Sequence, residues 1–123
     1  MKMDDKLYRV LLKLLEQTTS GIVKWDDASR LTEGEKFRVS FGDAIVEVWD
    51  GEVSTHDDEY GEVRERKFDA HVLNPHGLVV TQQEFTRDMG QPYQTAERLF
   101  LAARSSARRY DAILDNLLQK LGA

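Results

Sequence analysis

Two stretches of the chain place their hydrophobic residues at helical spacing. The first forms an apolar stripe near the N-terminus, made of Leu7, Val10, Leu11, Leu14 and Leu15. Recurrence at every third or fourth position predicts an amphipathic helix. Asp4 or Asp5 can cap its start, and we expect it to run to about Thr18 and to close at Gly21.

A longer stripe of the same period occupies the C-terminal third of the chain. It comprises Ala96, Leu99, Phe100, Ala103, Ala107, Tyr110, Leu114, Leu117, Leu118 and Leu121. Pro92 suits the first turn of this helix. A helix from Thr95 to Leu121 is roughly 40 Å long at 1.5 Å per residue, which exceeds the length of five-residue strands. We therefore expect its end to extend past the sheet.

Between the two helices the hydrophobic period changes to two. Phe37–Phe41 and Ala44–Trp49 alternate apolar and polar residues around a Gly42-Asp43 turn, which predicts a β-hairpin. The register pairs Phe41 with Ala44, Val39 with Val46, Phe37 with Val48, and Arg38 with Glu47. One face of this hairpin is apolar, and the opposite face carries the favourable Arg38–Glu47 charge pair.

The remaining segments predict shorter elements. We expect strands at Ile22–Trp25, Lys67–Leu73 and Leu78–Gln82, a turn at Asn74–Gly77, an acidic hairpin connection over Asp50–Arg66, and loops over Asp26–Gly34 and Glu84–Gln91. The predicted class is α+β, with an antiparallel β-meander of about four to five strands flanked by an N-terminal helix and a long C-terminal helix. A chain of 123 residues suits a single α+β domain over residues 1–123.

Charge is spread unevenly along the chain. The formal net charge is −5, and residues 26–65 alone carry four Lys/Arg against thirteen Asp/Glu. Residues 1–25 and 92–123 are mildly basic, each with five Lys/Arg against three Asp/Glu. Because an acidic chain repels phosphate backbones, we expect no nucleic-acid partner.

The absence of cysteine excludes disulfides, zinc–thiolate sites and thiol nucleophiles. The apolar run from Leu7 to Leu15 is interrupted by Arg9 and Lys13, so it resembles neither a signal-peptide core nor a membrane span. We therefore expect a cytoplasmic protein without a membrane partner.

Strand parity defines a candidate interaction surface on the face of the sheet turned away from the helices. Pairing Leu73 with Leu78 adds the following strand to this face. The surface consists of Arg38, Ile45, Glu47, Trp49, His71, Leu73, Leu78 and Val80. Contiguous exposed apolar groups usually mark an interaction site. One of the protein's own helices, a second copy in a homodimer, or a different protein partner could cover it.

The polar motifs supply no complete set for catalysis or metal binding. His56, His71 and His76 are too far apart along extended chain to share a metal ion. Asp69 and His71 share a strand face, as a carboxylate that orients an imidazole would, but no nucleophile accompanies them. We expect no catalytic residue, cofactor or metal.

Arg104 and Arg108 are candidate anion contacts, because they lie one helical turn apart and share a face. Guanidinium groups in this arrangement can grip a phosphate or an acidic partner. The alternative is a salt-bridged helix face, on which Asp111 and Asp115 neutralise part of the charge.

Two segments carry a resemblance to known proteins. They are Leu11-Leu12-x-Leu14-Leu15-x-x-Thr18-x-x-Gly21-x-x-x-Trp25 and Ala107-Arg108-Arg109-x-x-x-x-Leu114-x-x-Leu117-Leu118. Both resemble segments of small uncharacterised bacterial proteins with a helix–sheet–helix layout. The resemblance covers the two ends of the chain, skips the sheet and implies no activity.

These observations favour a non-enzymatic protein-binding or assembly module, such as an adaptor, an inhibitor or a small chaperone-like subunit. Trp49, Leu73 and Val80 are its expected anchors, with Arg38 and Glu47 as a polar rim.

The alternative function is that of a small-ligand-binding or enzymatic domain. Its pocket would lie between the sheet and the C-terminal helix, near Trp25, Tyr93 and Tyr110. His71 or Arg104 would then supply the polar group.

Overall fold

The computed structural model describes residues 4–29 and 34–122, apart from the side chains of residues 110 and 111. Its elements are α1 (Asp5–Thr19), β1 (Asp26–Asp27), β2 (Lys36–Ser40), β3 (Ile45–Asp57), β4 (Gly61–Leu73), β5 (Val79–Phe85), the 3₁₀ helix η1 (Arg87–Met89), α2 (Gln91–Arg108) and α3 (Tyr110–Lys120). The predicted α+β class is confirmed.

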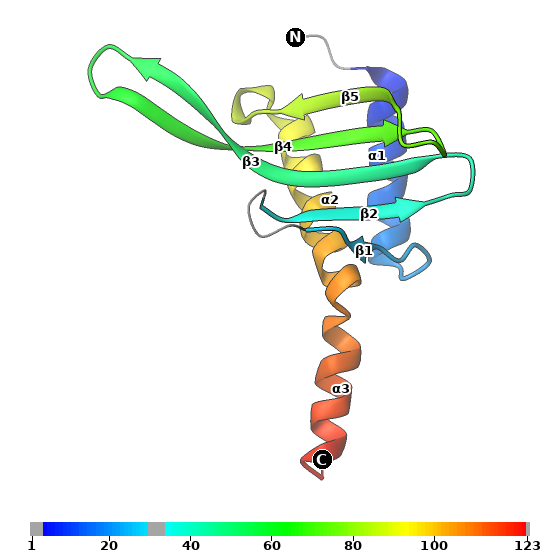
Figure 1. Ribbon diagram of the computed structural model, residues 1–123. Helices are drawn as coiled ribbons and strands as arrows, with labels where there is room; N and C mark the ends of the chain where they lie inside the picture. Colours follow the sequence, from blue (N-terminus) through cyan, green and yellow to red (C-terminus); the bar gives the residue numbers. More distant parts are fainter. Residues whose placement is uncertain (1–3, 30–33, 123) are drawn as a thin grey trace.

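The sheet of the described chain is an open antiparallel meander in the order β1-β2-β3-β4-β5 (Figure 1). Each strand therefore pairs with its neighbour in sequence, as short connections favour. Helices α1 and α2 both lie on one face of the sheet (Figure 1). The core between these layers contains Leu7, Leu11, Leu14, Val23, Trp25, Phe37, Val39, Val46, Val48, Phe68, Ala70, Phe85, Tyr93, Ala96, Leu99, Phe100 and Ala103.

Helix α1 forms as its sequence predicts. The Asp4 carboxylate accepts hydrogen bonds from the backbone N–H groups of Lys6 and Leu7, and Gly21 takes a left-handed conformation after the helix. The buried face of α1 is narrower than the predicted stripe. Leu11 is fully buried, whereas Val10 is 44% exposed and lies outside the core.

The first hairpin has the predicted register. Val39 pairs with Val46, Phe37 with Val48, and Arg38 with Glu47. The buried face of the hairpin meets α2 in a cluster of rings. The Phe100 ring lies with its centroid 5.4 Å from that of Phe37 and 5.3 Å from that of Phe68. Such offset ring pairs stabilise a core beyond the area that they bury.

The prediction of a long acidic connection at Asp50–Arg66 is wrong. β3 and β4 continue through this segment as a paired arm that extends beyond the rest of the sheet (Figure 1), and the turn occupies only residues 58–60. Opposite charges support the pairing, since Arg66 lies 3.3 Å from Asp50 and Arg64 lies 3.7 Å from Glu52. The arm has too few apolar residues for hydrophobic periodicity to reveal it.

Ile22–Trp25 is not a strand, contrary to the prediction. The backbone N–H groups of Ile22 and Val23 donate to the carbonyl of Gln17, and that of Trp25 donates to the hydroxyl of Ser106 on α2. Hydrogen bonds to two helices therefore take the place of a strand ladder, and only Asp26–Asp27 pairs with β2 as β1.

The last strand is longer than predicted and its register differs. β5 continues to Phe85 and is followed by η1, where a loop was expected. Leu73 pairs with Val79 rather than with Leu78, because the register shifts between Val72 and Leu73. A bulge of this kind adds one residue that strand parity alone does not reveal.

The predicted C-terminal helix is divided in two. Pro92 lies in the first turn of α2, and Arg109 interrupts the helix with a left-handed backbone (φ 51°). α3 then projects beyond the sheet and the other helices, as the predicted length of this region implied (Figure 1).

Candidate functional site

The outer face of the sheet carries a chain of polar and aromatic contacts at its centre. The Glu47 side chain is only 6% exposed, and its carboxylate accepts a hydrogen bond of 2.8 Å from Arg38 Nε. Lys36 lies 5.2 Å above the Trp49 ring, and the ring of His71 meets Trp49 edge-on at 4.2 Å between centroids. These residues satisfy one another across neighbouring strands.

Burial at this centre shifts the pKa of two groups. Desolvation raises the pKa of the Asp69 carboxyl, against the influence of the nearby Lys67 ammonium. Desolvation also lowers the pKa of His71, although Asp69 and Glu47 oppose the shift. Lys67 has a raised pKa because its ammonium donates a 2.7 Å hydrogen bond to Glu84. Burial therefore disfavours the charged forms of Asp69 and His71, whereas the hydrogen bond to Glu84 favours the charged form of Lys67.

Apolar exposure on the outer face is confined to one end of the sheet. Leu73 is buried, whereas Leu78, just before β5, and Val79 and Val80, at the start of this edge strand, are exposed. Ile45 is half-buried beside its register partner Leu73. The candidate interaction surface thus divides into a polar centre and an apolar end. Neither α1 nor α2 covers it, since both lie on the opposite face (Figure 1).

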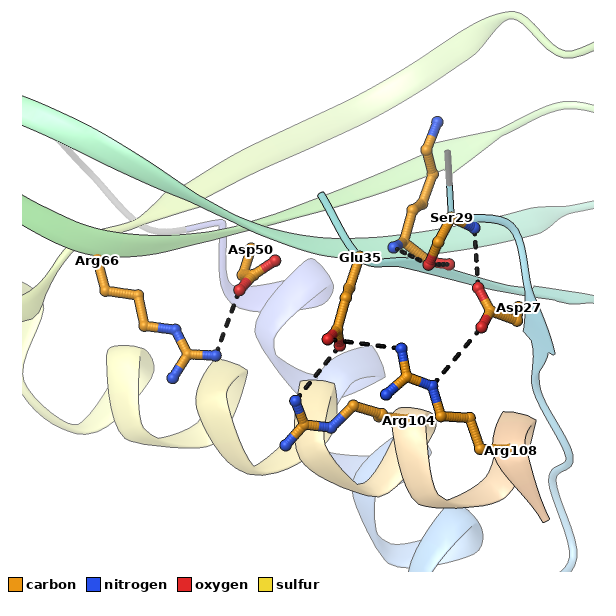
Figure 2. A network of polar contacts seen from close by, with 8 residues as sticks. Asp27, Ser29, Glu35, Asp50, Arg66, Arg104 and Arg108 are labelled. Atoms are coloured by element: carbon orange, nitrogen blue, oxygen red, sulfur yellow. Dashed lines mark hydrogen bonds and ion pairs between the residues drawn. The ribbon is translucent and has the colours of Figure 1, made fainter. Parts of the chain in front are cut away.

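Arg104 and Arg108 belong to a network of ion pairs along the junction between α2 and the sheet (Figure 2). Both guanidinium groups approach the Glu35 carboxylate, at 3.3 Å and 3.4 Å, and Arg108 lies 3.7 Å from Asp27. Hydrogen bonding by the side chain of Ser29, followed by that of its backbone N–H, is the main cause of the lowered pKa of Asp27. The two arginines therefore fit the salt-bridged alternative, with Glu35 and Asp27 among their partners. The side chain of Asp111 lies outside the described residues.

The arginines of this junction also cover the aromatic core. Arg104 lies 5.6 Å from the Phe100 ring centroid, Arg108 lies 5.6 Å from that of Phe37, and Arg66 lies 4.8 Å from that of Phe68. Guanidinium groups stack well on rings, so each side chain closes the edge of the core while it holds a carboxylate.

A groove of about 980 Å³ lies at the base of α3. The end of α1, the segment after it and the junction of α2 with α3 form its walls. Lining residues include Thr18, Lys24, Trp25, Ser105, Arg109 and Leu114. Ala102 and Ala112 also line the groove, and their side chains are small.

This groove is not the predicted ligand pocket, although Trp25 lines it. The ring of Tyr93 is buried in the core, 5.5 Å from that of Phe68. His71 lies on the outer face of the sheet, whereas Arg104 belongs to α2 on the opposite face. Neither of the two alternative polar groups, His71 or Arg104, lines this groove.

Helix α3 presents the most exposed apolar surface of the described chain. Its large apolar side chains are between 49% and 79% exposed, and they are Ile113, Leu114, Leu117, Leu118 and Leu121. Every described side chain from Ala112 to Gly122 is exposed. This stripe, which we call the α3 stripe, belongs to the predicted longer helical stripe except for Ile113, which the prediction did not include. Its separation from the core follows from the break at Arg109.

Two further observations limit the chemistry of the described residues. They contain no group of three or more His, Asp or Glu side chains that could hold a metal ion. No helix among them is both long and apolar enough to cross a membrane.

Comparisons with known proteins add no relative. No family model matches the chain, and no curated protein or solved structure shows significant similarity to it.

Proposed function

We propose that this protein is a non-enzymatic protein-binding or assembly module, with α3 as its principal docking element. The observation that supports this proposal is the α3 stripe, five large apolar side chains exposed on a helix that projects from the body. A contiguous exposed apolar surface is typical of an interaction site.

The isolation of α3 strengthens the argument. Helices of fewer than about 12 residues are marginal in water when nothing packs against them. α3 has 11 residues, and its described side chains are exposed. Burial of the α3 stripe by another chain would stabilise the helix and remove leucine side chains from water.

The apolar end of the outer sheet face is a second candidate surface. Val79 and Val80 lie on an edge strand, where unpaired backbone groups can accept an added strand. Val80 thus remains a proposed anchor, whereas Leu73 is already buried within the chain. Trp49 is a weaker anchor than expected, because Lys36 and His71 already contact its ring.

The test of the proposal asks whether the leucines of α3 belong to the folded core. At protein concentrations too low for association, replacing Leu117 and Leu118 together by Gln should shift the melting temperature by less than about 3 °C, since exposed positions contribute little to the folded state of the single chain. The matched control is Leu11→Gln in the fully buried face of α1, which should cause extensive unfolding. Extensive unfolding of the α3 variant would instead assign its leucines to the core.

We further propose a cytoplasmic protein whose partner is a protein rather than a nucleic acid or a membrane. The lack of cysteine and the net charge of −5 support this placement. The engagement of Arg104 and Arg108 by carboxylates also supports it, because it lowers the positive charge that α2 offers to a phosphate backbone.

The alternative, a small-ligand-binding domain, is supported by the groove at the base of α3. Lys24, Arg109 and Ser105 contribute polar atoms to its wall beside Trp25. A small anionic ligand in the groove would change Trp25 fluorescence, and Trp49→Phe would isolate that signal. An unchanged spectrum with a panel of small carboxylates and phosphates would remove this alternative.

A further inference from the structure

We infer that the occupant of the α3 stripe is a second copy of this chain, paired antiparallel so that each α3 ends at the groove of the other copy. This inference rests on the proposed function, because it assumes that α3 is the docking element. Its evidence is the shape of the stripe, the position of the groove and the charge at the groove wall.

The α3 stripe is continuous and wide enough for a helix partner. At 100° per residue, its five apolar side chains fall within an arc of about 140°. Asp115, Asn116 and Gln119 project from the remaining arc. The pattern is that of a helix that buries one face and leaves the other in water.

The groove adjoins the stripe within the same chain. Leu114 belongs to both, and Ala112 and Arg109 line the groove just before it. A two-fold rotation gives both copies the same contacts. The α3 stripes then pack on each other, and each groove receives the end of the other copy's α3. Full antiparallel overlap of two α3 helices places Leu117 at the level of Ile113 of the partner. It also brings Leu121 to the level of the partner's Arg109, where the groove begins.

Helix dipoles favour the antiparallel arrangement. The C-terminal end of a helix carries partial negative charge on its free carbonyl groups, and in α3 this end also carries Lys120. In this pairing it points toward a groove wall of the other copy that contains two basic residues, Lys24 and Arg109, and one acidic residue, Asp26. Neighbouring antiparallel helices also oppose their dipoles favourably, whereas a parallel pair aligns them.

The area available is sufficient for a weak or moderate dimer. The exposed parts of the α3 stripe offer on the order of 500 Å² per chain, so two copies can bury at most on the order of 1,000 Å² through the stripes alone. This total reaches the lower bound of specific interfaces.

Sedimentation equilibrium of the full chain at high micromolar concentration tests the inference. We expect a dimer. Leu117→Glu should raise its dissociation constant by about 100-fold or more, because the change occurs twice in a buried apolar contact. Gln119→Glu adds the same charge on the opposite side of α3 and should alter the constant by less than about threefold. A monomeric wild type, or equal effects of the two substitutions, would overturn the inference.

Single cysteines test the orientation, since the natural chain has none. A mixture of the Tyr110→Cys and Leu121→Cys chains should form a disulfide-linked dimer under mild oxidation. Leu121→Cys alone should not, because antiparallel overlap keeps the two copies of that residue at opposite ends. Efficient linkage of Leu121→Cys to itself would exclude the antiparallel arrangement.

Hydrogen exchange separates failure of this inference from failure of the proposed function. If the chain is monomeric and the α3 amides exchange rapidly, the second copy is excluded while α3 stays available to a different protein. If the chain is monomeric and the same amides are strongly protected, α3 packs on its own body, and both proposals are wrong.

Discussion

The indole of Trp25 donates a 2.9 Å hydrogen bond from Nε1 to the hydroxyl of Thr18, in the last turns of α1. Both residues are buried. The backbone N–H of Trp25 also donates to Ser106 of α2. One residue between the first helix and the sheet therefore connects both helices that pack on the sheet, and it forms part of the groove at the base of α3.

Removal of this acceptor should destabilise the fold. Thr18→Val keeps the shape of the side chain but leaves the buried indole N–H without its partner, at a cost of about 1–3 kcal/mol. Urea unfolding followed by tryptophan fluorescence measures the loss. Thr19→Val is the matched control, because Thr19 is exposed and should cost under about 0.5 kcal/mol. Equal costs would mean that the hydrogen bond contributes nothing.

The Glu47 carboxylate should depend on Arg38. Arg38→Met removes the main partner of a carboxylate that is 6% exposed, and we expect a loss of about 1–2 kcal/mol, since Lys36 remains 4.0 Å away. Arg64→Met, in the exposed arm, should change the free energy of unfolding by less than about 0.5 kcal/mol. A loss at Arg64 as large as that at Arg38 would contradict the role of burial.

Protonation of His71 should weaken the fold below neutral pH. Its lowered pKa means that the unfolded chain, with a value near 6.5, takes up the proton first as the pH falls. The contribution of His71 to stability is therefore fully present above about pH 6.5 and declines below it. The raised pKa of Asp69 has the opposite effect, because it lowers the stability of the fold as the pH rises above 3.8.

The His71→Gln variant isolates this effect in urea unfolding from about pH 7 to pH 5. Its free energy of unfolding should fall less steeply with decreasing pH than that of the wild type. His76→Gln, in the exposed turn before β5, should keep the wild-type slope. An unaltered slope in His71→Gln would show that Glu47, Asp69 and Lys36 balance the charge of the imidazolium.

Phe100 should be the most sensitive ring of the core. Phe100→Ala removes contacts with Phe37 and Phe68 and leaves a cavity beneath Arg104, so we expect a loss of about 3–5 kcal/mol by denaturant unfolding. Phe41→Ala, on a ring that is 47% exposed beside the first turn, should cost under about 1.5 kcal/mol. Comparable losses would mean that the interior relaxes around Phe100.

Arg109→Gly should stabilise the chain by about 0.5–1 kcal/mol. Glycine adopts the left-handed backbone at this position without the steric cost that a side chain incurs. The same substitution at Arg98, an exposed position inside α2, should destabilise by about 1 kcal/mol. Thermal unfolding compares the two. Destabilisation by both would indicate an unbroken helix through residue 109.

Much of the architecture follows from local patterns. Sequence predicts features that depend on neighbouring residues. These are the cap of α1 at Asp4, the hairpin around Gly42 and the start of α2 near Pro92. The arm of β3 and β4 escapes prediction, because its pairing relies on charge partners such as Glu52 and Arg64 in place of apolar alternation.

The contacts of the candidate site are harder to predict from the sequence than the fold. Arg104 and Arg108 were placed on one helix face, but their partners lie 69 and 81 residues away along the chain, at Glu35 and Asp27. No local pattern encodes such pairs. The bulge beside Leu73 similarly shifts β5 by one residue, which parity cannot anticipate.

The left-handed backbone of Arg109 means that one pair of dihedral angles aims the whole of α3. A helix of 11 residues is roughly 16 Å long, so a small rotation at its root moves its tip by several ångströms. α2 is anchored in the core, whereas α3 is not, so a bound chain can set the final angle at little energetic cost. The distance between bodies in an assembly would then be adjustable at this joint without any change in the sheet.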